Sequence, residues 1–302
     1  KTVNQVVEDL LDAKGKAGVS ERYLDDLDQR CTKFADYFRN KPMIAFTADD
    51  VRRFLTLKIF GRDNKDSLGP RSTNNFICAL RTLFRFAKSR DYLPQEYREM
   101  DRVDLVKDKG GDITIYTPRE MADLLAHAQD DEVLYLAICG FAGIRTEEFV
   151  RLDWQEFKWQ SGVIEITAGK AKTASRRLVP ITDNLRAWVE PIAKRRGNRG
   201  LVWPHGRPYL HCRMYKLKKG KARGLFVRAG VERKPNALRH SFISCRVAET
   251  KNVAEVALEA GNSPKMIFSN YRELVTAEDA KAWFAIMPAV AAAARSKIVA
   301  MK

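Results

Sequence analysis

A charged segment with two adjacent glycines divides this 302-residue chain. Residues 106–112 read Val-Lys-Asp-Lys-Gly-Gly-Asp, a composition typical of a linker between domains. The sequence on either side is long enough to bury a core of its own, because 45% of all residues are hydrophobic. We therefore predict one domain at residues 1–105, a linker at 106–112 and a second domain at 113–302.

The part before the linker carries apolar stripes at helical spacing. Three stripes stand out: Val6, Val7, Leu10 and Leu11; Tyr23, Leu24, Leu27, Cys31, Phe34 and Phe38; and Ile77, Leu80, Leu83, Phe84 and Ala87. Thr47 is predicted to cap a further helix over residues 49–60, and residues 61–70 are predicted to form a polar loop. Such stripes usually build a core, so the first domain is predicted to be a helical bundle.

The part after the linker mixes helix and strand signals. Residues 117–120 have the form of a capping box with proline at the first helical position, which predicts a helix start. Residues 163–167 and 177–181 are short β-rich runs on either side of a basic stretch, and we predict that they form adjacent strands of a small sheet. The rest is predicted to be helical, so the expected fold class is mainly α with a small antiparallel β-sheet.

The charge of the chain favours a polyanionic partner. Lys and Arg number 54 against 38 Asp and Glu, a formal net charge of +16, and nucleic acid is the first such partner to consider. A basic surface that is merely solvated is the alternative. The chain has no run of about 18 apolar residues and no signal-peptide pattern, so we expect a cytoplasmic protein without a membrane partner. Because it begins at Lys1 rather than Met, we also expect some N-terminal sequence to precede it.

The cysteines point to reduced thiols rather than to disulfides or metal. There are five of them, widely scattered and without C-x-x-C spacing: Cys31, Cys78, Cys139, Cys212 and Cys245. His205 and His211 lie near Cys212, but their spacing fits no common zinc pattern. We therefore expect no disulfide, no bound metal and no cofactor.

Four short segments of the second domain combine phosphate-binding cations with one tyrosine. They are residues 143–148 (Gly-Ile-Arg-Thr-Glu-Glu), 169–180, 236–242 (Asn-Ala-Leu-Arg-His-Ser-Phe) and 261–271, which ends at Tyr271. In their order and spacing these segments resemble the active-site boxes of the tyrosine recombinase, or phage integrase, family, and the resemblance covers nearly all of residues 113–275. It implies a helical, SAM-like core-DNA-binding domain followed by an α+β catalytic domain.

The resemblance also implies a role for each box. Tyr271 would be the nucleophile, forming a 3′-phosphotyrosyl bond that lets DNA be rejoined without metal or ATP. Arg145 and Arg239 would bind the phosphate, a task that suits arginine because its planar guanidinium can donate to two phosphate oxygens. Lys172 would protonate the leaving 5′ oxygen, and Glu148 matches the acidic residue that supports the first arginine.

Two asparagines depart from the family pattern. Asn236 stands where the family usually carries histidine, and Asn262 where it carries histidine or tryptophan. An amide does not exchange a proton near neutral pH, so Asn236 cannot act as a general base, whereas Asn262 can still bond a phosphate oxygen. We expect slowed rather than abolished chemistry. His240, beside Arg239, is a candidate substitute base, although the resemblance implies a structural role for it.

Further basic residues are predicted to bind DNA phosphates. They are Lys170, Arg176 and Arg177 in the second domain, Arg71, Arg81, Arg85 and Lys88 in the first, and the basic residues between 216 and 221. The resemblance implies double-stranded DNA as the partner and a homotetramer in the synapse. The alanine-rich tail, residues 285–300, would dock on a neighbouring subunit or pack on its own.

Three functions remain open on the sequence alone. The first is a site-specific recombinase or integrase of a mobile element. The second is a degenerate relative that grips DNA without cutting it, and the third is a type IB topoisomerase-like nicking enzyme. The retained Lys172, Arg145, Arg239 and Tyr271 favour the first, because a purely binding protein has no use for the nucleophile.

Overall fold

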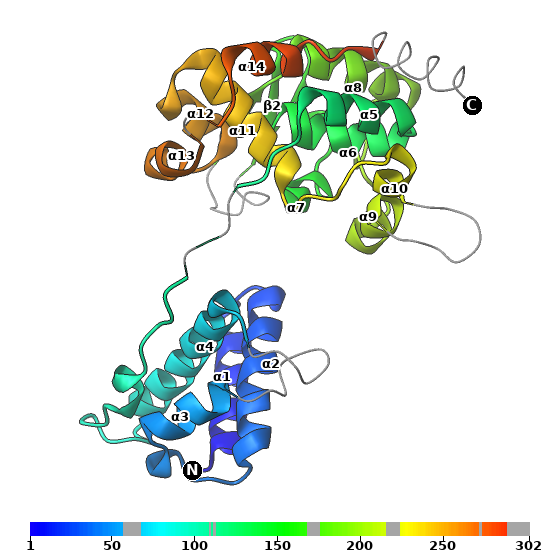
Figure 1. Cartoon of the computed structure of the whole chain (residues 1–302). Coiled ribbons are helices and arrows are strands. Elements are labelled where there is room, and N and C mark those ends of the chain that lie inside the picture. Colours follow the sequence, from blue (N-terminus) through cyan, green and yellow to red (C-terminus); the bar gives the residue numbers. More distant parts are fainter. Residues whose placement is uncertain are drawn as a thin grey trace. The chain divides into compact units, whose positions relative to one another are not determined.

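The computed structural model describes residues 1–56, 68–108, 110, 113–167, 176–215, 224–271 and 274–288. The chain divides into two compact units, Lys1–Gly111 and Asp112–Lys302, and each unit is described by itself (Figure 1). Within the described residues, no helix combines the length and the apolarity needed to cross a membrane.

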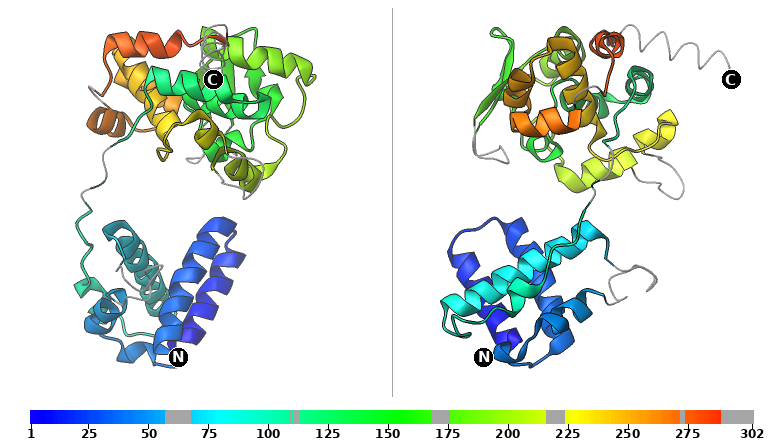
Figure 2. Two further views of the ribbon diagram at one scale, coloured as in Figure 1. Left: turned by 45° about the vertical axis from the view of Figure 1, so that its right-hand side comes forward. Right: turned by 60° about the vertical axis from the view of Figure 1, so that its left-hand side comes forward.

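The first unit is built from helices. They are α1 (Val3–Lys16), α2 (Glu21–Phe38), α3 (Ala48–Leu55) and α4 (Pro70–Ser89), with 3-10 turns η1 (Met43–Ala45) and η3 (Glu99–Arg102). Figures 1 and 2 show α1 and α2 side by side, and α4 packs against both. Most residues of the apolar stripes lie in the core of this unit, as the helical spacing predicted, but Tyr23 is exposed.

Aromatic rings fill the core of this unit. Phe34 on α2 is fully buried, and its ring lies 5.0 Å from that of Phe46, 5.1 Å from that of Phe54 and 6.3 Å from that of Phe84. Rings at these separations attract one another in addition to the area they bury. Helices α2, α3 and α4 and the segment after η1 are thereby packed around Phe34.

Helix α3 has the predicted cap but ends earlier than predicted. Thr47 caps α3, accepting a hydrogen bond from the backbone N–H of Asp50 whose side chain bonds back to Thr47, so the predicted cap is confirmed. The predicted end of that helix at residue 60 is wrong: α3 ends at Leu55, and the Thr56 hydroxyl donates to the carbonyl oxygen of Arg53. Such side-chain bonds compete with helix continuation. Residues 61–67 of the predicted loop lie outside the described residues, and Pro70 already belongs to α4.

The second unit surrounds one buried helix. The described helices are α5 (Pro118–His127), α6 (Asp130–Phe141), α7 (Thr146–Phe149), α8 (Asp183–Arg195), α9 (Gly206–Tyr215), α10 (Leu225–Ala229), α11 (Ala237–Thr250), α12 (Val253–Ala260), α13 (Pro264–Tyr271) and α14 (Ala277–Phe284). Every residue of α6 from Glu132 to Phe141 is buried, which requires apolar neighbours on all sides. Helices α5, α7, α8 and α11 supply them. The predicted start of α5 is confirmed by the capping box between Thr117 and Glu120.

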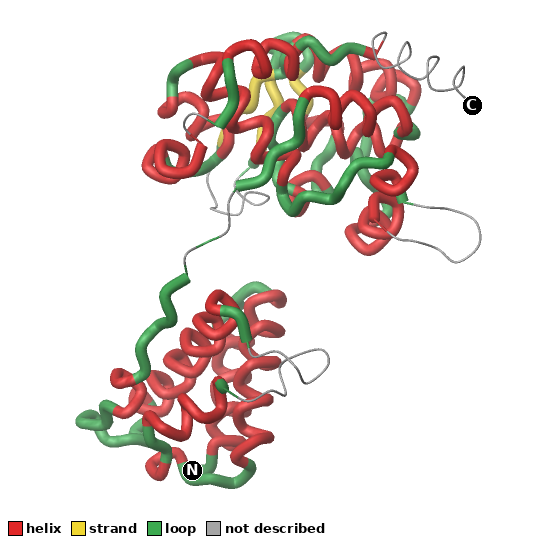
Figure 3. The backbone as a smooth tube through the Cα atoms, in the orientation of Figure 1, coloured by secondary structure: helices red, strands yellow, loops and turns green. Residues whose placement is uncertain are grey.

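A small antiparallel sheet completes this unit, and its strands are few among the helices (Figure 3). Its order is β1 (Phe157–Lys158), β2 (Val163–Ile166) and β3 (Arg177–Pro180), after the 3-10 turn η4 (Trp154–Glu156). Ile164 faces Val179, and Ile166 faces Arg177. The predicted pairing of the two β-rich runs and the mainly α fold class are confirmed, while the two-residue strand β1 was not predicted. Strand β3 packs on α12.

Candidate active site

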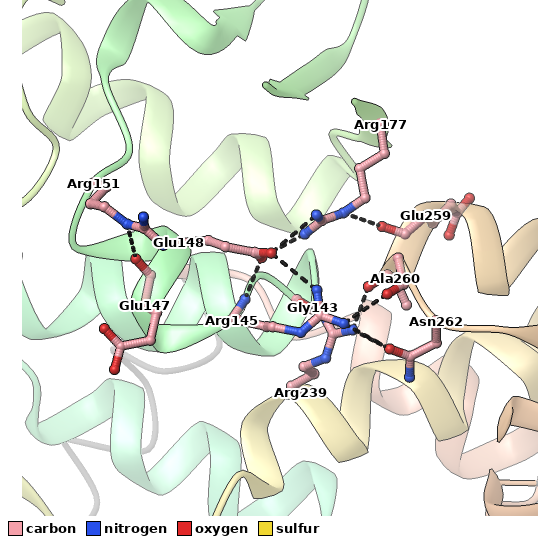
Figure 4. Close-up of polar contacts among 11 residues, drawn as sticks. Gly143, Arg145, Glu147, Glu148, Arg151, Arg177, Arg239, Glu259, Ala260 and Asn262 are labelled. Atoms are coloured by element: carbon pink, nitrogen blue, oxygen red, sulfur yellow. Dashed lines mark hydrogen bonds and ion pairs between the residues drawn. The ribbon is translucent and has the colours of Figure 1, made fainter. Parts of the chain in front are cut away.

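Four elements of the second unit bring three arginines together (Figure 4). Arg145 precedes the first turn of α7, Arg239 lies in the first turn of α11, and Arg177 opens strand β3. The backbone that ends α12 supplies acceptors between them. Residues far apart in the sequence thus form one cluster of positive charge.

Arg145 is held on two sides. Its Nη1 donates to Oε1 of Glu148 at 3.0 Å, and its backbone N–H donates to Oε2 of the same carboxylate at 3.0 Å. Its Nη2 donates to the carbonyl oxygen of Gly261 at 2.7 Å and to Oδ1 of Asn262 at 2.8 Å. Because Arg145 is the N-cap residue of α7, the carboxylate of Glu148 caps the helix and also orients the guanidinium.

Arg239 and Arg145 donate to the same side-chain amide, that of Asn262. Its Nη2 donates to Oδ1 of Asn262 at 3.0 Å and to the carbonyl oxygen of Ala260, and its Nη1 donates to the carbonyl oxygen of Gly143. Burial and the nearby charge of Arg145 lower the pKa of Arg239 to about 9, so the guanidinium is still charged at neutral pH. One side-chain oxygen therefore orients both predicted phosphate ligands.

A buried ion pair supports this arrangement. The side chains of Glu148 and Arg177 are 1% and 5% exposed, and they join through two bonds, Nη2 to Oε2 at 2.6 Å and Nη1 to Oε1 at 3.1 Å. Burial alone would raise the pKa of Glu148, but the bonds from Arg177 and Arg145 hold it at about 2. Arg177 also donates from Nε to the carbonyl oxygen of Glu259 at 3.1 Å, which ties β3 to α12.

Arg177 is buried, and its surroundings differ from those expected of a residue that binds DNA. The sequence predicted a DNA-phosphate ligand, whereas the guanidinium forms a bidentate pair with Glu148 and contacts the end of α12. A direct phosphate contact would require these bonds to break and would leave a buried carboxylate without its partner. The geometry instead makes Arg177 a residue that positions Glu148, and through it Arg145.

Two glycines allow the close approach of these elements. Gly143 has φ +60°, and a Cβ there would lie 2.2 Å from the ring of Phe242 on α11. Gly261 has φ +61°, and a Cβ there would lie 3.2 Å from the side chain of Arg177. Glycine adopts the left-handed backbone at these two positions without strain and leaves room for the neighbouring side chains. The carbonyl oxygens of Gly143 and Gly261 can therefore reach Arg239 and Arg145.

We expect Gly143→Ala to destabilise the protein more than Gly162→Ala. Both glycines have positive φ, but a Cβ at Gly162 meets nothing within 4 Å, so alanine there adds only backbone strain of about 1–3 kcal/mol. At Gly143 the overlap with Phe242 adds about 1–3 kcal/mol more. Urea unfolding of the two variants measures the difference, and equal losses would show that the ring of Phe242 moves aside freely.

The predicted nucleophile lies against a histidine. The hydroxyl of Tyr271, at the end of α13, is 2.7 Å from Nδ1 of His240 on α11. Burial raises the pKa of Tyr271, and the charges of Arg239 and Arg145 act in the opposite direction. Burial and the charge of Arg239 lower the pKa of His240. Tyr271 itself is only 5% exposed, so the hydroxyl is enclosed near the arginine pair.

The residues of this site lie in a region that matches a known protein family. The sequence model of the phage integrase family matches residues 115–273, just over half of the chain. The chain belongs to the phage integrase family. Residues 145, 148, 239, 262 and 271 all fall within the matched range. A search among curated protein sequences gave no significant match.

Solved structures share the fold of this phage integrase family member at low sequence identity. A lambda integrase dimer bound to a COC′ core site is 12% identical with a TM-score of 0.69, over 91% of this chain and 98% of that one. The Tn1549 transposon integrase in complex with transposon right end DNA is 16% identical with a TM-score of 0.64, over 93% and 98%. The XerH site-specific recombinase bound to a palindromic difH substrate is 17% identical with a TM-score of 0.57, over 82% and 76%.

The other predicted catalytic positions of this integrase family member are less enclosed or lie outside the described residues. Asn236 is exposed at the N-cap of α11, with φ 56° and ψ 7°. Lys172 and Lys170 lie outside the described residues, as do residues 216–221 and the tail from residue 289 onward. Of the predicted catalytic residues, the structure brings five into one region: Arg145, Glu148, Arg239, Asn262 and Tyr271.

The remaining basic residues predicted to bind DNA differ in their surroundings. In the first unit Arg71 and Arg85 are exposed, whereas Arg81 donates to the carbonyl oxygen of Val103 at 2.8 Å and Lys88 to that of Tyr97 at 3.1 Å. In the second unit Arg176 pairs with Glu165 at 2.8 Å on the outside of the sheet. Their role toward DNA stays a prediction.

Proposed function

We propose that this chain is a site-specific DNA recombinase, an integrase of a mobile element, that cleaves and rejoins DNA through a 3′-phosphotyrosyl intermediate on Tyr271. The observation that carries the proposal is the pair of guanidinium groups that share Oδ1 of Asn262, at 2.8 Å for Arg145 and 3.0 Å for Arg239. The hydroxyl of Tyr271 is bonded to the residue next to Arg239. A phosphate bound by the arginines would thus be near the nucleophile.

The proposed reaction is an exchange of phosphoester bonds. The Tyr271 oxygen attacks the scissile phosphorus, the bond from phosphorus to the 5′ oxygen breaks, and that oxygen leaves as a hydroxyl after protonation by Lys172. Arg145 and Arg239 stabilise the charge that develops on the phosphate oxygens. Since the phosphotyrosyl bond keeps the energy of the broken linkage, a 5′-hydroxyl of the partner strand can attack it without ATP or metal.

Asn262 can take part in this chemistry, although it is not a base. Its Oδ1 accepts from both arginines, which leaves the amide nitrogen as the group that would donate to a phosphate oxygen. Asn236 can neither gain nor lose a proton near neutral pH. General acid-base catalysis contributes typically about 10²- to 10⁴-fold, so its loss at one position attenuates the reaction without abolishing it.

Double-stranded DNA is the proposed partner. The chain carries a formal charge of +16, and exposed cations such as Arg71 and Arg85 are suited to phosphate contacts. The relatives of similar fold were solved with DNA, one as a dimer on its core site. We propose that this chain likewise acts on DNA as an oligomer, a tetramer when two sites are paired.

A second function is favoured by one observation. Tyr271 is 5% exposed and its hydroxyl is already bonded to His240, as expected of a protein that binds DNA and does not cut it. In that case the arginine pair would hold a phosphate and Tyr271 would remain in the core. The two functions differ in whether a covalent adduct forms.

The deciding experiment is capture of that adduct. The protein is mixed with end-labelled, nicked duplexes tiled across both ends of its mobile element, because a nick lets the cleaved fragment leave and traps the intermediate. We expect a denaturant-resistant adduct, with the nucleotide on the peptide that contains Tyr271 after proteolysis and mass spectrometry. Tight, salt-sensitive binding with no adduct on any duplex would instead establish the binding protein.

We expect Asn236→His to increase the rate of adduct formation. Histidine, like asparagine, is enriched among residues with positive φ, so it can take the backbone at this N-cap, and it restores a group that titrates near neutral pH. An increase of about 10-fold or more in single-turnover rate is expected, within the range of general acid-base effects. Asn236→Gln is the control, because it lengthens the side chain without adding a base. A histidine variant no faster than the glutamine variant would contradict the prediction.

A further inference from the structure

The hydroxyl of Tyr271 already has a basic partner in the structure. Nδ1 of His240 lies 2.7 Å from the tyrosine oxygen, within the range that a general base requires. The ring centroids lie 5.6 Å apart at 35°, so the two rings are in contact rather than linked through water. We propose that His240 accepts the proton of Tyr271 during cleavage. This inference rests on the proposed function.

The position of His240 is fixed by α11. It is the fourth residue of that helix, next to Arg239, and its carbonyl oxygen accepts the hydroxyl of Ser244 at 2.9 Å. Asn236 precedes the same helix but is exposed, with its backbone in the left-handed region. Of the two positions on this segment, the one that contacts the nucleophile therefore carries the imidazole.

The charge state of His240 suits a proton acceptor. Burial and the charge of Arg239 lower the pKa of His240, so the ring is neutral at pH 7 and one of its nitrogens holds a lone pair. Since Nδ1 faces the Tyr271 hydroxyl, the tautomer with the proton on Nε2 lets Nδ1 accept from the phenol. A protonated ring would have no lone pair to offer.

The proton transfer balances with the rest of the reaction. The O–H bond of Tyr271 breaks and its proton joins Nδ1 of His240, while the tyrosine oxygen bonds to phosphorus and the 5′ oxygen leaves with a proton from Lys172. The negative phosphate offsets the charge of Arg239, which otherwise opposes an imidazolium. On rejoining, the phosphotyrosyl bond breaks and His240 returns the proton to the phenolate oxygen.

The test separates nucleophile activation from leaving-group protonation. Nicked duplexes that trap the adduct are made with oxygen or with sulfur at the bridging 5′ position, because a thiolate leaves without being protonated. His240→Gln is expected to slow adduct formation by about 10²- to 10⁴-fold on both duplexes. Lys172→Ala is expected to be slow on the oxygen duplex and to recover on the sulfur duplex. Loss of the His240→Gln defect on the sulfur duplex would overturn the inference.

Chemical rescue gives a second, independent measurement. With His240→Ala the missing ring leaves space beside Tyr271, and imidazole added to the buffer is expected to increase adduct formation by about 10-fold or more while leaving the wild type unchanged. A variant that is slow only because it is misfolded would not respond. Failure of imidazole to rescue His240→Ala, in a variant that melts and binds DNA like the wild type, would overturn the inference.

The controls keep this result distinct from failure of the proposed function. His205→Gln makes the same chemical change at a half-exposed histidine on another part of the unit and is expected to cut DNA like the wild type. Wild-type protein that makes no adduct would overturn the proposed function and this inference together. Wild-type protein that makes the adduct, with His240→Gln equally fast, would overturn this inference alone.

Discussion

Phenylalanine at position 271 is expected to abolish the covalent protein–DNA adduct, because no oxygen remains to attack the phosphorus. DNA binding should persist, since the phosphate ligands Arg145 and Arg239 keep every bond that orients them. The folded state loses one hydrogen bond, from Tyr271 to His240, at a cost of about 1 kcal/mol. Denaturing electrophoresis of the nicked-duplex reaction measures the adduct, and a mobility shift at fixed salt measures binding.

The matched control for this variant is Tyr209→Phe. Tyr209 lies on α9 and is 44% exposed, so it loses the same atom from a place without a role in the site. We expect it to form the adduct at the wild-type rate. An adduct that survives in Tyr271→Phe would assign the nucleophile to another residue and would refute the role given to Tyr271.

Alanine in place of Glu148 is expected to destabilise the second unit by about 3–5 kcal/mol, the usual cost of removing one partner from a buried ion pair. The side chain of Arg177 is 5% exposed and would be left without the carboxylate that accepts two of its bonds. Arg145 would lose the same partner. Urea unfolding followed by circular dichroism measures the change, which is a large fraction of the stability of a typical domain.

The control for Glu148→Ala is Glu165, on the sheet that also carries Arg177. Glu165→Ala breaks the pairs with Arg176 and Lys158, whose side chains are 68% and 48% exposed, and should cost only about 0–1 kcal/mol. A double variant with leucine at both 148 and 177 is expected to regain much of the loss, because it removes both buried charges. If Glu148→Ala lost no more stability than Glu165→Ala, the buried pair would not be the support described above.

The lowered pKa of Glu148 also makes the free energy of unfolding depend on pH. Its pKa is about 2 in the folded protein against an ordinary value of 4.5, so the unfolded chain binds the proton more readily. The stabilisation is fully present above pH 4.5 and is lost as the pH falls toward 2. Unfolding measured between pH 6 and pH 3 should show a larger loss in the wild type than in the leucine double variant, which keeps only the contributions of other carboxylates with lowered pKa values, such as Asp50.

Local signals in the sequence were enough to predict much of the fold. The capping box at Thr117 and the cap at Thr47 depend on side chains that bond the backbone a few residues away, so spacing alone reveals them. The pairing of β2 with β3 followed from two β-rich runs joined by a short connection. The strand β1 was missed because it depends on pairing with β2. The end of α3 was missed because it involves a bond from the Thr56 hydroxyl to the backbone, which the apolar spacing does not reveal.

The site was only partly predictable. The resemblance to the family's active-site boxes predicted Arg145, Arg239 and Tyr271 as site residues. It did not predict the contact between Tyr271 and His240, since those residues are 31 positions apart and meet only when α11 packs on α13. The burial of Arg177 did have a signal. Val179 lies two residues further along β3 and is buried, so strand alternation places Arg177 on the same inner face.

The net charge of the arginine cluster at the end of α12 determines which charge state of a bound phosphate it stabilises most. Three guanidinium groups, those of Arg145, Arg177 and Arg239, are served there by the single carboxylate of Glu148 among the described residues, which leaves two positive charges in excess. A DNA diester carries one negative charge, whereas the five-coordinate phosphorane formed by attack carries two. In the proposed reaction the excess charge therefore matches the transition state better than the substrate, which is the condition for accelerating a reaction rather than merely binding its reactant.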